Sequence, residues 1–355
     1  MNREPTTTKP LDVPIPPLDD DARGTALDRQ AELTKPPGSL GRLETMAAEI
    51  AAMQSTAEPT VDPAVVVTMA ADHGVVGEGV SAYPQSITAA MVANFCDGGA
   101  AVSALCDAGE VENVIVDMGV AGPVPEGVVD HRIADGTANI AAEPAMSRRQ
   151  ALTAIAAGRS VVAEHASGAN LIGLGEMGIG NTTPSAAVTA LLTDNPVDAV
   201  TGRGTGIDES TRAKKVAVIE QAIGTTSPDP TDPVDVLRSV GGFEIAGLVG
   251  VTLEAASRRM PVVVDGFIAG AAALVAAEIE PRVTDYLLGS HESVEPGHEA
   301  QLDTLALEPC FEYGMRLGEG TGAAVAVGVY RAACAAHNGM STFAEAGLET
   351  ESSRQ

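Results

Sequence analysis

Short runs of β-branched residues alternate with longer Ala-rich segments along this chain, and this alternation constrains the fold more than any other feature. Four runs are typical of buried parallel strands: 65–69, 114–117, 170–173 and 262–265. Three segments have helical patterns, with Ser39 and Ser147 as expected caps of the first two: 39–54, 147–166 and 321–336. The sequence therefore predicts an α/β fold, with a mostly parallel sheet flanked by helices and ligands bound beyond the carboxyl ends of the strands.

The charge of the chain limits its partners. With 48 acidic and 21 basic residues, the formal net charge is -27. Such a surface repels phosphate backbones, and no Lys/Arg cluster with interleaved aromatic residues offsets it, so we expect no nucleic-acid partner. No uninterrupted apolar run reaches about 18 residues and the start lacks a signal-peptide pattern, so we expect a cytoplasmic protein without a membrane span.

One carboxylate stands among glycines in the block Arg316–Gly322. Gly318 and Gly320 flank Glu319, and backbone without side chains lets a flat substrate come close to the carboxylate. This spacing predicts a functional site. The alternative is that Glu319 caps the Ala/Val-rich helix expected to follow it.

A second glycine-rich block, 173–184, follows an expected strand and carries Glu176. Its glycines match the dinucleotide pattern G-x-G-x-x-G, but the acidic residues near the required spacing, Asp194 and Asp198, precede the strand-like segment 199–201 instead of ending it. Pro184 also places the helix start several residues after the last glycine. An NAD-dependent oxidoreductase is therefore the weaker alternative.

Cations and histidines are sparse. The chain has four lysines, and Lys214 and Lys215 follow a third glycine-rich block, 202–208, where they form either a solvated pair or a phosphate ligand. His73 has no second His or Cys at ligand spacing, so a hydrogen-bonded structural histidine is favoured over a metal ligand, and the same holds for His291 and His298. We expect neither a metal nor a cofactor.

Six blocks in this order resemble the nicotinate-nucleotide:dimethylbenzimidazole phosphoribosyltransferase family: 33–44, 71–74, 175–184, 240–243, 265–267 and 315–322. The resemblance runs from about residue 25 to about residue 338. It implies a Rossmann-like, mostly parallel sheet with a smaller helical domain from both chain ends, and a homodimer. The expected division is an extended lead-in (1–22), a small helical domain (23–60 plus about 285–342), a large α/β domain (61–284) and a flexible tail (343–355).

The resemblance also implies an activity: transfer of ribose 5-phosphate from nicotinate mononucleotide to dimethylbenzimidazole, with inversion at the anomeric carbon, as in cobalamin lower-ligand assembly. Glu319 matches the general base and Glu176 the second active-site carboxylate. The expected substrate-binding residues are Ser81, Tyr83, Pro84, Gln85, Gly175, Gly178, Gly204, Lys215, Ser290, Leu317 and Gly318. A non-catalytic sensor or carrier of benzimidazoles or nucleotides on the same fold is the alternative.

Overall fold

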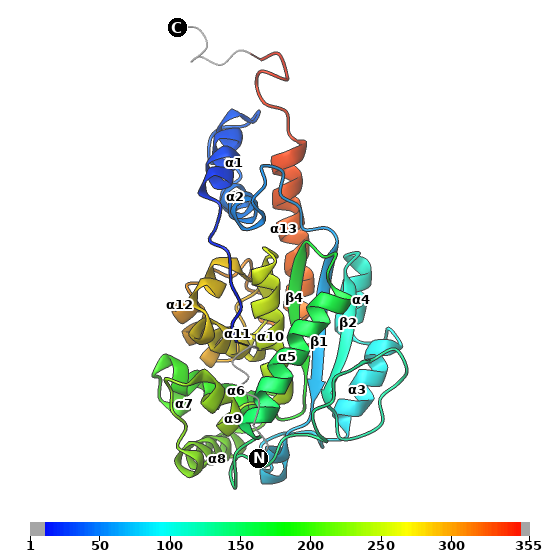
Figure 1. Cartoon of the computed structure of the whole chain (residues 1–355), viewed down its shortest axis with the longest axis vertical. Helices are drawn as coiled ribbons and strands as arrows, with labels where there is room; N and C mark the ends of the chain where they lie inside the picture. The colour runs from blue at the N-terminus through cyan, green and yellow to red at the C-terminus, as the bar shows by residue number, and fades with distance from the viewer. Residues whose placement is uncertain (1–10, 349–355) are drawn as a thin grey trace, which may run out of the picture.

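A computed structural model describes residues 11–348 and contains a six-stranded parallel sheet in the order β3-β2-β1-β4-β5-β6 (Figure 1). The strands are β1 (Ala64–Ala71), β2 (Glu112–Gly119), β3 (Val129–Asp130), β4 (Leu171–Met177), β5 (Val262–Val264) and β6 (Leu287–Gly289). The four expected strands correspond to β1, β2, β4 and β5, which confirms the predicted fold class. The chain winds outward from β1 to β3 and then restarts at β4, so the topological switch point lies between β1 and β4.

Helices cover both faces of the sheet. On one face α10 (Phe243–Ser257) packs on β1, β2 and β4, with α5 (Arg148–His165) against it and α11 (Phe267–Ile279) beside it. The opposite face is covered by α13 (Thr321–Gly339) and α4 (Ala101–Ala108). The other helices are α1 (Asp20–Glu32), α2 (Arg42–Gln54), η1 (Gly74–Glu78), α3 (Ile87–Cys96), α6 (Thr182–Thr193), α7 (Val197–Val200), α8 (Glu209–Thr226), α9 (Pro233–Val240), η2 (Pro281–Tyr286) and α12 (Gly297–Leu305).

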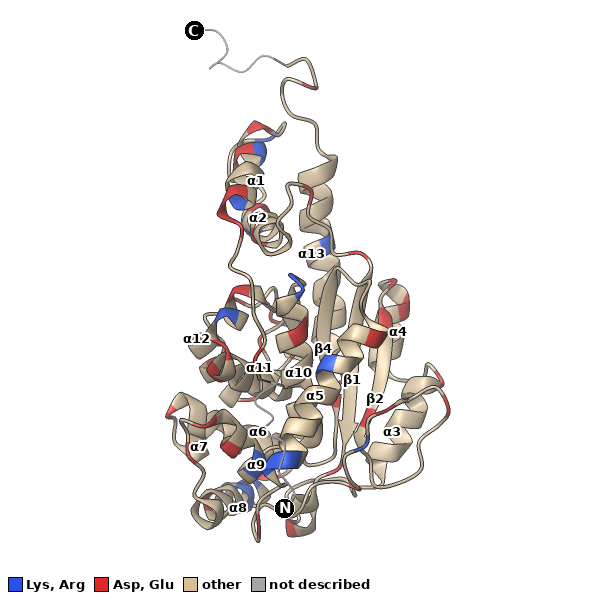
Figure 2. Cartoon of the chain, in the orientation of Figure 1, with Lys and Arg blue, Asp and Glu red and all other residues tan. Residues whose placement is uncertain are grey.

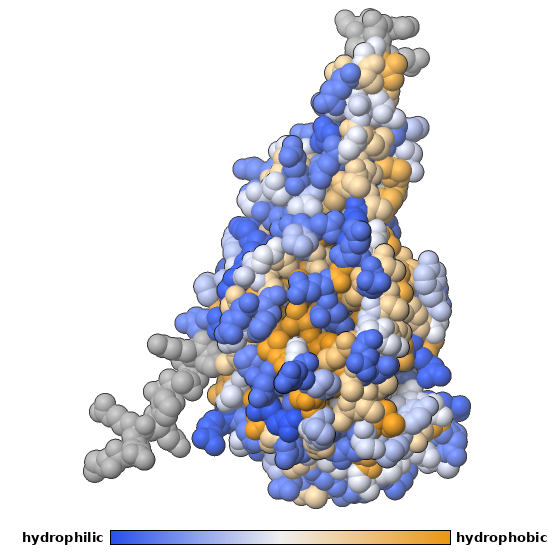
Figure 3. Space-filling model, turned by 90° about the vertical axis from the view of Figure 1, so that its right-hand side faces the viewer, coloured by the Kyte–Doolittle hydropathy of each residue, from blue (hydrophilic) through white to orange (hydrophobic). Residues whose placement is uncertain are grey.

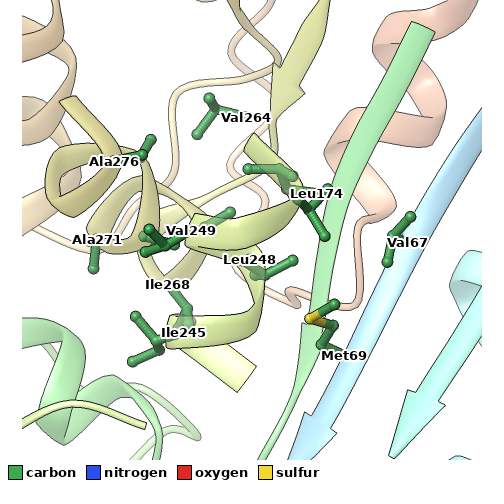
Figure 4. Close-up of a cluster of buried hydrophobic side chains, with 14 of the residues drawn as sticks. Val67, Met69, Leu174, Ile245, Leu248, Val249, Val264, Ile268, Ala271 and Ala276 are labelled. Atoms are coloured by element: carbon green, nitrogen blue, oxygen red, sulfur yellow. The ribbon is translucent and has the colours of Figure 1, made fainter. Parts of the chain in front are cut away.

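The centre of the hydrophobic core lies between the sheet and α10. Figure 4 shows Met69 of β1 and Leu174 of β4 beside Leu248 of α10, and all three side chains are fully buried. Neighbouring residues on β4 point to opposite faces of the sheet. Leu174 therefore faces α10, whereas Gly173 faces Ala323 of α13 on the other side. This packing fixes the end of β4 and the start of α13 relative to each other.

An arm of α1, α2 and the distal part of α13 projects from the body of the molecule (Figure 1). In contrast, β6 joins the main sheet and α12 packs on α6, α7 and α11. Residues from about 285 to 305 were expected in the small helical domain, and the structure places them with the large one because β6 completes the parallel sheet. The remaining domain boundaries stay predictions.

Several local expectations were wrong. Ser39 does not cap a helix, because α2 starts after Gly41, whereas Ser147 forms a full capping box with Gln150 at the start of α5. The strand-like segment 199–201 lies mostly in α7. β-Branched residues alone cannot distinguish a short helix from a strand.

The chain ends are more ordered than expected within the described range. α1 begins at Asp20, inside the expected lead-in, and Val13 and Ile15 are buried in the main core. The backbone N–H of Phe343 donates to the carbonyl of Glu32, so the expected flexible tail is anchored at its start. The rest of that tail, 349–355, and residues 1–10 lie outside the described residues.

One stretch, Ile87–Ala108, is long and apolar enough to cross a membrane by length and composition. The structure divides it into α3 and α4, separated by residues 97–100. Figure 3 views the molecule from this side and shows apolar residues spread over a broad area below the arm. The two short helices are each far below the roughly 20 residues that a membrane-spanning helix needs.

Candidate active site

A cavity of about 500 Å³ lies at the carboxyl ends of β4 and β5. Its walls come from these strand ends, from α3, from the starts of α6 and α11, and from the loop before α13. This is the position expected for a ligand in a sheet of this topology, and the volume is in the usual range for a small-molecule site.

Glu319 lines the cavity in a strained loop. Its φ of 65° lies in the left-handed region, between Gly318 at 82° and Gly320 at 90°. The side chain is 5% exposed, and its Oε2 accepts a hydrogen bond of 3.4 Å from the backbone N–H of Val102 at the start of α4. Burial raises the pKa of Glu319, and the Val102 N–H partly opposes this effect. The carboxyl group does not cap α13, so the capping alternative was wrong.

Glu176 enters the cavity from β4. Asn181 donates its side-chain amide to Oε2, so Asn181 does not cap α6 with its side chain. Burial raises the pKa of Glu176 to about 8, with further raising by the charges of Asp265 and Glu244. At neutral pH and without substrate, Glu176 is therefore mainly protonated.

Asp265 follows β5 and holds the start of α13. Its Oδ1 accepts from the N–H of Ala323 at 2.9 Å and its Oδ2 from the N–H of Gly320 at 3.3 Å. Burial raises its pKa to about 7, against the effect of these N–H groups. Asp265 fixes the loop that carries Glu319.

Lys215 approaches the cavity from α8 but stays behind its wall. Its Nζ donates to Thr182 Oγ1 at 2.7 Å, and the side chain is 1% exposed. Burial lowers the pKa of Lys215 to about 8, and the charge of Glu295 opposes this shift. Thr182, at the start of α6, and Gly204 line the cavity in front of this ammonium group.

The expected site residues divide into two groups. Seven line the cavity: Glu176, Glu319, Tyr83, Gly178, Gly204, Leu317 and Gly318. Six do not line it: Ser81, Pro84, Gln85, Gly175, Lys215 and Ser290. Ser290 is buried and donates to the carbonyl of Asp265 at 2.5 Å, while Ser81 contacts the hydroxyl of Thr205, which lines the cavity.

The glycines of the dinucleotide-like pattern have a packing role. Gly173 and Gly175 lie inside β4, and a Cβ on Gly175 would come within 2.6 Å of the carbonyl oxygen of Glu319. The strand needs glycine there because the loop before α13 passes directly over it. The pattern is therefore not the turn between a strand and a helix that binds a dinucleotide.

The histidines make hydrogen bonds to protein groups. His73 Nε2 lies 2.7 Å from Glu244 Oε1, with both residues buried, which confirms the structural interpretation of His73. His291 contacts Ser290 Oγ, and His298 Nδ1 accepts from the N–H of Ser293. Within residues 11–348, no three His, Cys, Asp or Glu side chains are arranged to hold a metal ion. Independence from metals stays a prediction.

Residues 15–348 match a family model described as phosphoribosyltransferase. The nicotinate-nucleotide–dimethylbenzimidazole phosphoribosyltransferase of Roseiflexus sp. (strain RS-1) is 50% identical over 94% of this chain and 96% of its own length. The enzyme of that name from Desulforudis audaxviator is 47% identical over the same shares of the two chains. The chain belongs to this phosphoribosyltransferase family.

Solved structures agree with the assignment of this chain to the phosphoribosyltransferase family. The crystal structure of CobT from Thermus thermophilus superposes with a TM-score of 0.89 and 42% sequence identity. The alignment covers 93% of this chain and 99% of the Thermus chain. The fold and the family that the sequence implied are confirmed.

Two carboxylates that line the cavity of this phosphoribosyltransferase, Asp265 and Glu295, were not among the expected site residues. Asp265 could have been found, because it is the last residue of an expected strand, at the edge of the sheet where ligands bind. Glu295 lines the cavity and accepts from the N–H of Gly204 at 2.9 Å. Its segment has neither a strand nor a glycine-rich pattern, so the sequence offers no comparable signal for it.

Proposed function

We propose that this protein transfers ribose 5-phosphate from nicotinate mononucleotide to dimethylbenzimidazole, forms α-ribazole 5'-phosphate and releases nicotinate. This reaction belongs to cobalamin lower-ligand assembly. Relatives about half identical over nearly the whole chain carry the corresponding enzyme name, which supports the assignment.

The distribution of charge in the cavity is the observation that carries this proposal. Glu176, Asp265 and Glu319 line the cavity, and none forms an ion pair with a Lys or Arg of residues 11–348. The start of α6 with Lys215 behind it provides a region suited to an anion. Nicotinate mononucleotide has a cationic pyridinium ring, which favours the ionised forms of these carboxyl groups, and an anionic phosphate, so it matches both regions.

The chemistry needs few protein groups. The pyridinium nitrogen leaves the anomeric carbon as a neutral pyridine, so the leaving group requires no general acid. The attacking benzimidazole nitrogen becomes positively charged, and the N–H of the azole must lose a proton to restore neutrality. Glu319 is the proposed acceptor of that proton, since its raised pKa makes it a stronger base than an exposed glutamate.

Attack on the face opposite the leaving pyridine inverts the anomeric carbon from β to α. The ribose develops positive charge as the bond to the pyridine breaks. Glu176 stabilises that charge once the cationic pyridinium ring of the bound nucleotide has favoured loss of its proton. An apolar wall that includes Tyr83, Ile87 and Met91 suits a flat aromatic base.

A direct assay tests the proposal. Purified protein incubated with nicotinate mononucleotide and dimethylbenzimidazole is expected to release nicotinate and α-ribazole 5'-phosphate in equal amounts, as measured by liquid chromatography. Binding of both compounds without product would instead support the sensor or carrier alternative. Retention of activity in excess chelator would test the predicted independence from metals.

We also propose that the protein is a homodimer. Large apolar side chains at the cavity mouth are unusually exposed, with Tyr83 at 53% and Leu317 at 57%, and a second copy would cover them. Sedimentation velocity at micromolar concentration is expected to give twice the mass of the 35.9 kDa chain. A monomer under these conditions would contradict this proposal. The cytoplasmic location stays a prediction.

A further inference from the structure

Helix α4 begins without a cap of its own. The residue before it, Ala100, has the extended backbone of a helix cap, with a φ of -88° and a ψ of 162°, but its methyl group cannot accept a hydrogen bond. Alanine is among the poorest residues at this position, where Ser, Thr, Asp or Asn usually accept from the first backbone N–H groups. The first turn of α4 therefore has backbone donors without a partner in its own segment.

Glu319 supplies an acceptor from a distant part of the chain. The N–H of Val102, in the first turn of α4, donates to Glu319 Oε2 at 3.4 Å, across 217 positions of sequence. Val102 is fully buried and Ala100 is 3% exposed, so water has little access to this donor. Helix α4 also packs on α13, which begins two residues after Glu319, and this packing keeps the carboxylate at the end of α4.

The contact gives the two carboxylate oxygens of Glu319 different surroundings. The bond from Val102 to Oε2 is the one hydrogen bond that this carboxylate accepts within residues 11–348. Oε1 accepts none from these residues and stays accessible at the wall of the cavity that Glu319 lines. One oxygen is therefore fixed by the protein, and the other can meet a substrate.

The carboxyl groups around Glu319 oppose its ionisation. Burial raises the pKa of Glu319, and the N–H of Val102 opposes this effect. Glu176 of β4 and Asp265 after β5 also line the cavity, and the negative charge of either one favours the neutral acid. Ionisation of the base therefore needs a positive partner.

Cations do not provide that partner. Helices α3 and α4 and strand β1 contain no Lys, Arg or His. Arg316, the one Lys or Arg among the described residues that line the cavity, donates to a backbone carbonyl of the loop after α7. Burial lowers the pKa of His291 to about 4, so this cavity residue is neutral near pH 7. The partial positive charge at the start of α4 is therefore the partner that the described residues offer to Glu319.

We propose that the N-terminus of α4 positions the general base and keeps it ionised. The N–H of Val102 holds Oε2 of Glu319, and Oε1 accepts the proton as the N–H bond of the attacking azole breaks. This rests on the proposed function and deepens it, because it names the group that prepares Glu319 for proton transfer. Val102 acts through its backbone, as a positioning residue.

The test removes the N–H of Val102 and keeps its side chain. Nonsense suppression with the α-hydroxy analogue of valine replaces this N–H by an ester oxygen. The α-hydroxy analogue of alanine at Ala101 is the matched control, because Ala101 is exposed at the same end of α4 and its N–H has no partner within residues 11–348. Val102→Pro and Ala101→Pro repeat the comparison by ordinary mutagenesis, since the first turn of a helix tolerates proline.

We expect loss of the Val102 N–H to lower kcat at pH 6 by at least about 10-fold, the size of a hydrogen bond to a charged group. At pH 9 kcat should stay within about 3-fold of the parental value, because the carboxylate is then ionised without this donor. The acidic limb of the pH profile should thus move to higher pH. Glu176 and Asp265 titrate in every variant, so the shift is measured against the Ala101 control, which should match the parent.

Carboxyl ¹³C NMR provides a readout that does not depend on turnover. In protein without substrates, Glu319 should titrate at higher pH in the Val102 ester variant than in the parent, with Glu319→Gln used to assign its resonance. An equal loss of kcat at every pH would overturn the proposal and give Val102 a role in folding alone. An unchanged Glu319 titration, or the same shift in the Ala101 control, would also overturn it. An absence of product in the parent would count against the proposed function, whereas the titration tests the contact with α4 separately.

Discussion

Glu319 combines backbone strain with a buried carboxylate. A non-glycine residue at positive φ is uncommon and costs on the order of 1 kcal/mol or more, so the surrounding structure must hold it in place. Asp265 does so by accepting from the N–H groups of Gly320 and Ala323. Strain of this kind is frequent at sites that pre-position a reactive group.

We expect Glu319→Gln to lower turnover by at least about 100-fold, because a positioned general base contributes roughly 10²- to 10⁴-fold. Glutamine can still accept from the N–H of Val102, so the melting temperature and substrate binding should remain close to those of the parent. Steady-state kinetics and thermal unfolding measure the two effects. Glu312→Gln, an exposed position in the same segment, is the control. A variant with more than about a third of the parental rate would exclude an essential base of that size.

The raised pKa of Glu176 predicts how the free energy of unfolding depends on pH. Its folded pKa of about 8 lies above the ordinary value, so its stabilising contribution is fully present below about pH 4 and is lost as pH rises through 8. Between pH 6 and pH 8 the parent without substrate should lose about 2 to 3 kcal/mol of stability from this residue, at 1.4 kcal/mol per unit. Glu176→Gln removes the titrating group, so it should not lose this contribution.

Chemical denaturation at pH 6, 7, 8 and 9 measures this difference. The stability of Glu176→Gln relative to the parent should increase with pH, although Asp265 gives both proteins a common dependence in the same direction. A stability difference that is the same at every pH would show that Glu176 does not titrate in this range. Glu312→Gln again provides an exposed control.

At the residue scale, glycine patterns in the sequence pointed to Glu319 and Glu176, and both line the cavity, while their catalytic roles stay predictions. The sequence analysis did not find Asp265 as a site residue, although Asp265 ends an expected strand at the edge of the sheet where ligands bind. Sequence spacing alone does not show that Asp265 reaches the N–H groups of Gly320 and Ala323. It also could not show that Gly175 accommodates the passing loop rather than a ligand.

At the scale of elements, α5 and α10 cross at glycines. A Cβ on Gly158 of α5 would collide with the carbonyl oxygen of Gly247, and one on Gly250 of α10 would collide with that of Ile155. The two helix backbones therefore touch directly. The Ala- and Gly-rich composition makes this close packing possible.

Gly158→Ala is expected to destabilise the protein by about 1–3 kcal/mol, because the added methyl group forces two packed helices apart. Urea unfolding measures the change. Gly224→Ala is the matched control, since Gly224 also lies in a helix but has no neighbouring atom within 4 Å of a built Cβ. Its stability should rise by roughly 0.5–1 kcal/mol from helix propensity alone. Destabilisation of both variants to the same extent would contradict the packing argument.

Strands β1, β2 and β4 could be predicted from sequence, as could the three-valine β5, whereas β3 and β6 could not. β1 and β2 have eight residues each, enough for a clear β-branched pattern. β3 has two residues and β6 three, and such strands are defined by their neighbours rather than by their own composition. The expected domain boundary near 285 was misplaced for this reason.

At the scale of the whole molecule, α13 connects the cavity with the projecting arm. Its first residues follow Glu319 and its later turns contact α2, so one helix spans both regions (Figure 1). The resemblance indicated that both chain ends contribute to one small helical unit. The sequence alone could not show that the same helix begins at the candidate base.

The distribution of charge has a further consequence for how the nucleotide reaches the cavity. Acidic positions are spread over most of the chain (Figure 2), and the net charge is -27, while Lys215 is 1% exposed. The nucleotide is itself a net anion. The negatively charged protein therefore repels it electrostatically while the two are still far apart, before any direct contact forms. Dissolved ions reduce the range of this repulsion, the screening length, to about 8 Å at 0.15 M ionic strength. Stopped-flow measurements should therefore show association becoming faster as sodium chloride is added from about 10 to about 150 mM, the range over which this screening length shrinks most. Slower association would indicate local attraction stronger than the overall field.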